Sequence, residues 1–154
     1  MVIKPDEMKV SKSLKKSILN KGFVIKSNEN FEAVMRNCSN IKRKHEDSTW
    51  ISEEFIQAYT DLHHLDIAFS IECYLDEELV GGLYGLLIGD VFCGESMFAK
   101  VTDASKVAFY HLCQQAEKNG IKLIDCQVYN DHLASLGAYE ITREDYFKIL
   151  KESF

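Results

Sequence analysis

The sequence has little of what marks membrane and secreted proteins. It contains one proline and one tryptophan in 154 residues, and glycine or charge interrupts its apolar runs well short of a membrane span. Residues 1–26 are dotted with lysine where a secretory leader would have an apolar centre. We therefore expect no signal peptide and no contact with a membrane, and the expected location is cytoplasmic.

Common cofactor and metal motifs are also missing. The five cysteines form no C-x-x-C pair, which favours reduced thiols over a disulfide framework or a zinc site. No phosphate-binding G-x-x-x-x-G-K-[ST] motif occurs, and the glycines of residues 81–85 lie inside a predicted strand rather than before a helix. His63 and His64 are neighbours on a predicted helix, so they do not face the same way. We expect no metal and no cofactor.

What the chain does have is enough apolar residues, 46%, to bury a core, and an uneven charge. Residues 1–47 carry a net charge of +5 and residues 48–154 one of −11. We therefore divide the chain into a short basic N-terminal segment, 1–47, and a folded domain, 48–154. A basic front suits a polyanionic partner, although two ordinary solvated surfaces would have the same composition.

Hydrophobic periodicity and capping residues predict the following elements. Pro5 is placed in a disordered start. Helices are expected over 13–20, 31–38, 52–65 and 104–119, with a helical turn over 130–136 and a last helix opened by Thr142 and Asp145. Strands are expected over 22–26, 68–75, 79–88, 91–98 and 121–128, with a tight turn at 89–90.

From Trp50 onward this order is helix, three-strand meander, helix, strand, helix. It predicts an α+β fold with a mixed, mainly antiparallel sheet flanked by helices. The order is similar to that of the acyl-CoA N-acyltransferase (GNAT) fold, but a shared order alone says little about function.

Polar residues interrupt two of the predicted strands. Glu95 lies in an otherwise apolar strand, where a carboxylate is costly to bury unless it is paired or used. Strand alternation puts Asp125 and Gln127 on one face of the last strand, which suggests a site. The alternatives are a strand end where Glu95 reaches solvent, and a hydrogen-bonded Asp–Gln pair without a chemical role.

A cysteine nucleophile activated by His132 is a further alternative. It is the less favoured one, because Cys93 and Cys126 lie inside predicted strands, where most cysteines are part of the core.

At these residues the chain resembles the leucyl/phenylalanyl-tRNA–protein transferases, over roughly residues 8–150. Several ungapped blocks in one order carry the resemblance, which is more specific than any single motif. The blocks are residues 49–51, 54–63, 70–72, 78–85, 92–98, 104–106, 122–128, 130–132 and 134–138, followed by Arg143, Asp145 and Tyr146.

The resemblance implies an enzyme that takes Leu, Phe or Met from aminoacyl-tRNA. It would pass that residue to the N-terminal amine of a protein beginning with Arg or Lys, as a mark for degradation. Its partners would be aminoacyl-tRNA and such acceptor proteins, with no role for DNA. The implied core is a GNAT-like fold that uses aminoacyl-tRNA in place of acyl-CoA.

The resemblance also implies the site residues. The catalytic trio matches Glu95, Asp125 and Gln127, and the adenosine-stacking and positioning aromatics match Trp50 and Tyr59. The apolar pocket for the transferred side chain matches Leu83, Phe92, Gly94, Phe109, Leu112, Ala116 and Ile124. The candidates for phosphate contacts with tRNA are Lys9, Lys12, Lys15, Lys16, Arg36, Lys42, Arg43 and Lys44.

The residue chemistry agrees with these roles. An aminoacyl ester is already activated, so the enzyme needs only to hold an amine about 3 Å from the carbonyl and to manage one proton. Gln127 would hold the amine or pass the proton, Asp125 would orient Gln127, and Glu95 would bind the α-ammonium of the transferred residue.

Two other functions stay open. One is an acyl-CoA-dependent N-acyltransferase, which residues 99–102 disfavour because they lack a glycine-rich pyrophosphate cradle. The other is a catalytically inactive relative that binds tRNA or protein N-termini, because most of the family's N-terminal domain and C-terminal tail have no counterpart in this sequence. A minimal active enzyme, or one that needs a partner chain, fits the same shortening.

Overall fold

A computed structural model describes residues 1–41 and 51–153. Its centre is a six-stranded sheet in the order β1-β6-β5-β4-β3-β2. All neighbouring strands are antiparallel except β5 and β6, which are parallel. The strands are β1 (Val2–Ile3), β2 (Val24–Ser27), β3 (Ala68–Leu75), β4 (Glu78–Ile88), β5 (Val91–Ala99) and β6 (Leu123–Asp125).

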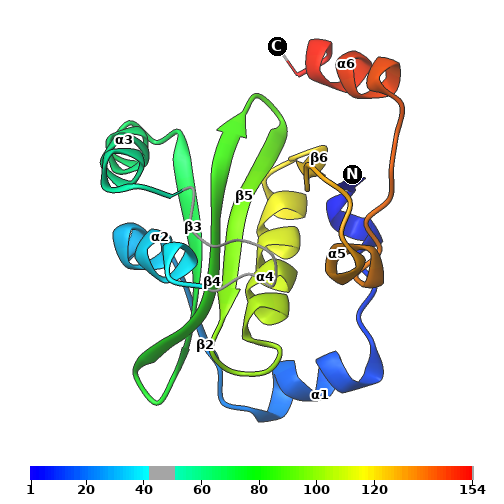
Figure 1. Ribbon diagram of the computed structural model, residues 1–154. Helices are drawn as coiled ribbons and strands as arrows, with labels where there is room; N and C mark the ends of the chain where they lie inside the picture. Colours follow the sequence, from blue (N-terminus) through cyan, green and yellow to red (C-terminus); the bar gives the residue numbers. More distant parts are fainter. Residues whose placement is uncertain (42–50, 154) are drawn as a thin grey trace.

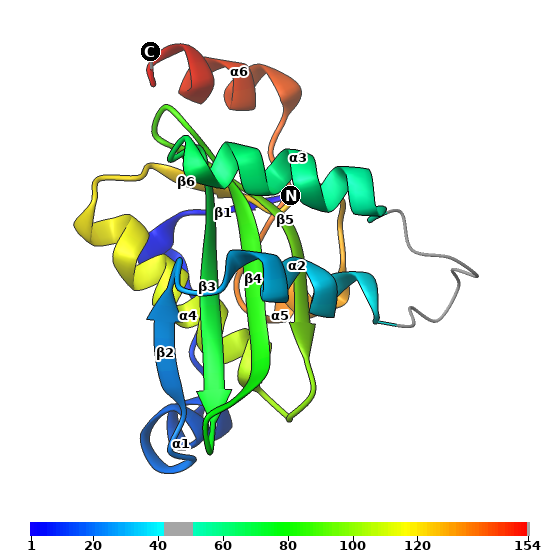
Figure 2. The same ribbon diagram turned by 90° about the vertical axis from the view of Figure 1, so that its left-hand side faces the viewer.

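Helices cover both faces of this sheet. On one face lie α2 (Phe31–Ser39) and α3 (Glu53–His64), and α4 (Ala104–Lys118) packs on the other (Figures 1 and 2). The shorter elements are a 3₁₀ turn (Pro5–Glu7), α1 (Lys12–Asn20), α5 (Asp131–Ser135) and α6 (Arg143–Lys151). The predicted α+β architecture with a mixed, mainly antiparallel sheet is therefore confirmed.

The sheet separates two main parts of the apolar core. Ile71, Leu83 and Phe92 pack with α4 on one face, whereas Ala68, Tyr84 and Phe98 pack under α2 and α3 on the other. This division follows the period of two that strand side chains obey. Both faces of β3 and β4 are buried, which explains why these strands read as nearly continuous apolar runs.

Most predicted elements are confirmed to within a few residues. The strand Ala68–Leu75 has the expected bounds, and the Thr142 hydroxyl accepts a hydrogen bond from the amide of Asp145 at 3.1 Å, as a helix cap does. Asp103 is the residue before α4, but its side chain does not cap that helix. Its carboxylate accepts a hydrogen bond from Ser17 Oγ of α1 at 2.7 Å instead.

One expectation for the start of the chain is wrong. Pro5 is not in a disordered start, because it is buried in the 3₁₀ turn that follows β1. The first 41 residues also supply β1 and β2 to the same sheet as the later strands, pairing with β6 and β3 respectively. The boundary expected at residues 47–48 lies outside the described residues.

The last strand is much shorter than the sequence predicts. It runs from Leu123 to Asp125 rather than from 121 to 128, and it pairs with β5 only as far as Cys93 and Asp125. Beyond this point β5 continues to Ala99, while the segment that follows β6 turns away towards α5. The sheet therefore opens between its two parallel strands.

A β-bulge stands at the start of this opening. Tyr84 of β4 pairs with Ser96 and Gly85 pairs with Gly94, so Glu95 of β5 is an extra residue with no partner opposite it. A bulge bends its strand and re-aims a side chain, and bulges are frequent next to active sites. The bulge takes Glu95 out of the ordinary alternation of β5.

The glycine opposite the bulge should be required for it. A Cβ atom on Gly85 would lie 2.2 Å from the carbonyl oxygen of Cys93 and 2.7 Å from the Phe92 ring. Since neither neighbour is a free side-chain end, we expect Gly85→Ala to lower the free energy of unfolding by about 1–3 kcal/mol or more.

Gly94→Ala is the matched control, because its Cβ would meet only the carbonyl oxygen of Asp125 at 3.4 Å. Urea denaturation of both variants measures the difference. Equal stability of Gly85→Ala and the wild-type protein would contradict this account of the bulge.

Candidate functional site

A largely apolar cavity of about 670 Å³ lies where the sheet opens. Its walls come from β4, β5, α4, the end of β6 and the chain that leads into α5. A cavity of this size fits a ligand the size of an amino-acid residue with part of its carrier. The lining residues that the sequence predicts are Leu83, Phe92, Gly94, Glu95, Phe109, Leu112, Ile124, Asp125 and Gln127.

Nine of the predicted site residues thus converge on one cavity. Ala116 does not line it, because this residue is buried in the core that packs α4 on the sheet. The lining also includes His132, which the sequence offers only in the less favoured cysteine–histidine alternative, and residues for which no site role is predicted, among them Tyr84, Ser96, Met97, Val128 and Leu133. Most of these residues are adjacent in sequence to predicted site residues. That adjacency is the only feature of the sequence that could have indicated them.

Glu95 is connected to α3 as well as to the cavity. Burial, together with the charge of the nearby Glu95 carboxylate, raises the pKa of Tyr59 to about 12. The Tyr59 ring stacks on Phe55, with 4.7 Å between ring centroids, and meets the Tyr84 ring edge to face. Tyr59 is therefore a neutral phenol that lies near Glu95, on the α3 face of the sheet.

Asp125 is held on both of its oxygens. Oδ1 accepts a hydrogen bond from the backbone N–H of Gln127 at 2.8 Å, and Oδ2 accepts one from the hydroxyl of Tyr146 on α6 at 2.8 Å. Hydrogen bonds to a carboxylate are stronger than those between neutral groups, so the plane of this carboxylate is well defined.

Gln127 does not continue the strand, contrary to the alternation that the sequence predicts. Its φ is +60°, in the left-handed region that few residues other than glycine adopt. The alternation of faces that the sequence predicts for this strand is therefore wrong beyond Asp125. A turn closed by the Asp125 carboxylate brings Asp125, Cys126, Gln127 and Val128 to the same cavity.

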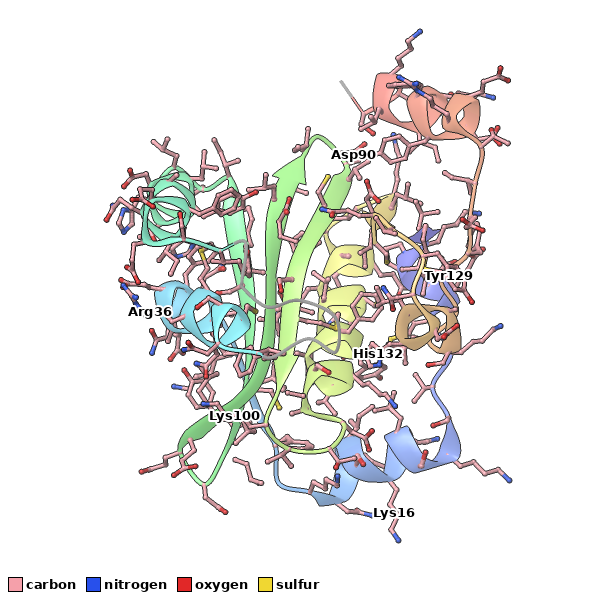
Figure 3. The ribbon with its side chains drawn as sticks, in the orientation of Figure 1. Lys16, Arg36, Asp90, Lys100, Tyr129 and His132 are labelled. Carbon is pink, nitrogen blue, oxygen red and sulfur yellow. The ribbon has the colours of Figure 1, made fainter. Side chains whose placement is uncertain are left out.

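The thiols and the histidine near the cavity are unsuited to covalent catalysis. Burial, with the charges of Asp125 and Glu95, raises the pKa of Cys93 to about 11, and burial with Asp125 raises that of Cys126 to about 12. Burial and Lys106 lower the pKa of His132, which lies on α5, on the side towards α4 (Figure 3). At neutral pH both thiols are protonated, so neither supplies the thiolate that the hypothesis of a cysteine nucleophile activated by His132 requires.

The predicted tRNA-binding residues do not lie together. Lys12, Lys15 and Lys16 are exposed on α1, and Lys9 is exposed just before it. Arg36 lies on α2, on another side of the molecule from Lys16 (Figure 3), and its guanidinium contacts Glu32 at 2.7 Å and Glu53 at 2.8 Å. The remaining predicted residues Trp50, Lys42, Arg43 and Lys44 lie outside the described residues.

Two further searches cover residues 1–41 and 51–153. Within them, no group of three or more histidine, cysteine or acidic side chains is placed to hold a metal ion. No helix there combines the length and the apolar character needed to cross a membrane.

Comparison with known proteins gives the family. Residues 2–151 match the sequence family described as leucyl/phenylalanyl-tRNA protein transferase. A leucyl/phenylalanyl-tRNA–protein transferase of Flavobacterium johnsoniae is 53% identical over 98% of this chain, and one of Nitrosospira multiformis is 50% identical over 99% of it. This chain belongs to the leucyl/phenylalanyl-tRNA–protein transferase family.

The family assignment confirms the resemblance of the sequence blocks. The chain covers 71% of the F. johnsoniae transferase, 65% of the N. multiformis one and 62% of a relative from Dechloromonas aromatica. It therefore spans about two thirds of the length of these curated relatives of the transferase family.

Solved structures confirm the fold of this family member. A predicted acetyltransferase from Clostridium acetobutylicum, crystallised with acetyl-CoA, superposes with a TM-score of 0.57 at 10% identity, covering 79% of this chain and 92% of that one. L-PGS from Bacillus licheniformis superposes with a TM-score of 0.53 at 12% identity, covering 97% of this chain and 50% of that one. At these identities the likeness is one of fold, and it confirms the GNAT-like architecture.

The left-handed backbone of Gln127 should cost stability that a glycine would recover. For residues with a Cβ this conformation costs about 1–2 kcal/mol, partly offset by the greater freedom of glycine in the unfolded chain. We expect Gln127→Gly to keep the free energy of unfolding or raise it by up to about 1 kcal/mol, and Gln127→Ala to leave it unchanged.

Thermal or urea unfolding of the two variants measures this difference. A Gln127→Gly protein that is clearly less stable than Gln127→Ala would contradict the view that the conformation is strained. It would mean that the left-handed backbone conformation at Gln127 costs no free energy in a residue with a Cβ atom.

Proposed function

We propose that this chain transfers Leu, Phe or Met from aminoacyl-tRNA to the N-terminal amine of a protein that begins with Arg or Lys, in the cytoplasm, as a mark for degradation. The observation that carries the proposal is the cavity between β5 and β6, where Glu95, Asp125 and Gln127 meet apolar walls. Family membership and about 50% identity to named transferases support the same activity.

The apolar walls suit the side chain that is transferred. Three of these apolar wall residues are Leu83 of β4 and Phe109 and Leu112 of α4. An apolar pocket discriminates a large apolar side chain from a smaller one by about 1–3 kcal/mol. This is enough to favour Leu, Phe or Met over alanine or glycine.

Glu95 supplies the complementary charge for the α-ammonium of the aminoacyl group. The carboxylate lines the cavity, and Tyr59 of α3 lies near it. A carboxylate in a partly apolar surrounding discriminates strongly between a free ammonium and an acylated amine, because an acylated amine leaves the charge unpaired. We therefore assign Glu95 to selection of esters with a free α-amine.

Asp125 and Gln127 serve the bond-forming step. The acceptor amine attacks the ester carbonyl carbon, a C–N bond forms, the bond from that carbon to the ribose oxygen breaks, and the amine's proton ends on this oxygen. Gln127 positions the amine, and the negative charge of Asp125 stabilises the positive charge that develops on the attacking nitrogen. No covalent enzyme intermediate is needed, in agreement with the neutral thiols of Cys93 and Cys126.

A second cavity gives the acceptor amine a route to this point. Asp125 and Gln127 line both the first cavity and a smaller one of about 370 Å³, whose other walls include Ile141, Thr142 and Tyr146. An amine that enters the second cavity reaches Gln127 without crossing the aminoacyl pocket. The net charge of −11 over residues 48–154 favours acceptors with a basic N-terminal residue.

The N-terminus of α4 argues against the alternative of an acyl-CoA-dependent enzyme. In this chain the Asp103 carboxylate lies there, hydrogen-bonded to Ser17 and 3.5 Å from Lys106 Nζ. These partners, Ser17 first, lower the pKa of Asp103, so the group stays ionised at neutral pH. A helix N-terminus usually attracts a phosphate, but here a pyrophosphate would meet a fixed negative charge.

A transfer assay tests the proposal. Purified protein mixed with Leu-tRNA or Phe-tRNA and a peptide that begins with Arg should yield the extended peptide. Glu95→Gln, Asp125→Asn and Gln127→Ala should each lower the rate at least tenfold without loss of stability, because each removes a group facing the reacting atoms.

Peptides beginning with Asp and with an acetylated Arg are the substrate controls, and Glu117→Ala on the exposed side of α4 is the variant control. Calorimetric titration with acetyl-CoA separates the CoA-dependent alternative, for which tight binding would be decisive. Binding of aminoacyl-tRNA without any transfer would instead indicate the inactive relative.

The lysines of α1 should contribute to tRNA affinity through phosphate contacts. Replacing Lys12, Lys15 and Lys16 together by alanine should weaken binding at low salt and reduce the slope of log K against log salt by about 2, since each lost contact removes about 0.7–0.9.

Filter binding of aminoacyl-tRNA over a range of salt concentrations measures this slope. A variant with Lys118, Lys148 and Lys151 replaced by alanine loses the same charge from other exposed positions. If both variants change the slope equally, the effect belongs to net charge and not to α1.

A further inference from the structure

Tyr146 of α6 contacts the candidate catalytic group Asp125, although the two residues are 21 positions apart in the sequence. Its hydroxyl donates to Asp125 Oδ2 at 2.8 Å, while the backbone N–H of Gln127 occupies Oδ1 at the same distance. We propose that Tyr146 is a positioning residue, which fixes the Asp125 carboxylate and through it the turn that presents Gln127 to the acceptor amine. This inference rests on the proposed function.

The two hydrogen bonds of Asp125 act on one rigid group. A carboxylate has two oxygens in one plane, so a donor on Oδ2 determines where Oδ1 lies. Oδ1 in turn holds the amide of Gln127, a residue whose φ of +60° has to be maintained by its surroundings. Loss of the Tyr146 hydroxyl leaves Asp125 free to rotate and removes the support of this turn.

Tyr146 is itself well anchored, as a positioning group has to be. Its ring packs partly buried with the cluster around Val2, Val91 and Leu123. Thr142 caps the start of α6. At the other end of the helix, Lys122 Nζ donates to the carbonyl oxygen of Glu152 at 3.0 Å.

The hydroxyl also remains a donor under working conditions. Burial and the neighbouring Asp125 carboxylate raise the pKa of Tyr146 well above its usual range, and Cys93 adds to the shift. A phenol that keeps its proton cannot serve as a general base at neutral pH. Its contribution is therefore the hydrogen bond to Asp125.

A double-mutant cycle on transfer tests this role. Tyr146→Phe keeps the ring and its packing but removes the hydroxyl, so we expect kcat to fall about tenfold or more while KM for aminoacyl-tRNA changes less than twofold. In an Asp125→Asn background the same change should have no further effect, because a residue that acts through Asp125 has nothing left to position.

Tyr74→Phe on β3 is the matched control for removing a tyrosine hydroxyl, because Tyr74 lies at the other side of the sheet from the cavity. Denaturation curves of all variants check that the fold is kept. If Tyr146→Phe lowers kcat equally in both backgrounds, or leaves it unchanged, Tyr146 does not act through Asp125 and the proposal is wrong.

A second measurement does not depend on activity. Hydrogen exchange followed by NMR should show faster exchange of the Gln127 amide in Tyr146→Phe than in the wild-type protein or in Tyr74→Phe. If the wild-type protein transfers nothing but this amide responds, the proposed function fails and the positioning role stands. If the amide exchanges at the same rate in all three proteins, the positioning role fails, whatever the activity.

Discussion

The arrangement of this protein depends on the early end of one strand pairing. β5 and β6 form the only parallel pair among the described strands, and their register ends at Cys93 and Asp125. Past that pair, β5 and the segment that follows β6 separate, and α4 closes the space behind them. Had the pairing continued to residue 128, the side chains of the two strands would fill this space. Asp125 and Gln127 would then be ordinary strand residues that border no cavity.

The opening brings together groups that burial alone would not tolerate. Glu95 and Asp125 both border an apolar cavity, and carboxylates in such places need hydrogen-bond partners. Asp125 receives one from the Tyr146 hydroxyl on α6, and the Tyr59 hydroxyl on α3 lies near Glu95. Tyrosines on two helices outside the sheet thus border the two carboxylates, while apolar residues shape the space between them.

Much of this architecture could be predicted from the sequence. The meander of β3 to β5 and the long helix α4 follow from apolar periodicity and turn residues, and polar residues in apolar strands point directly to Glu95 and Asp125. The blocks shared with the transferase family add the apolar lining, of which Ala116 alone is misplaced. These features are local, or are carried over from relatives position by position.

The remainder depends on contacts that are distant in sequence. The bulge at Glu95 arises from its pairing with β4, and the pairing of β1 with β6, which orders the first residues, joins positions more than 120 apart. Alternation fails at Gln127 because the Asp125 carboxylate takes the place of a ladder partner. Nothing in the residues around Tyr146 indicates that its hydroxyl reaches Asp125.

If the proposed function is right, the cavity between β5 and β6 holds the aminoacyl group with its α-amine against Glu95. A crystal structure with 3′-phenylalanylamino-3′-deoxyadenosine, in which a stable amide replaces the ester, is the sharpest test. The phenyl ring should lie between Leu83 and Phe109, and the α-amine within hydrogen-bond distance of Glu95. A ring bound outside this cavity, or an amine directed away from Glu95, would contradict this binding mode.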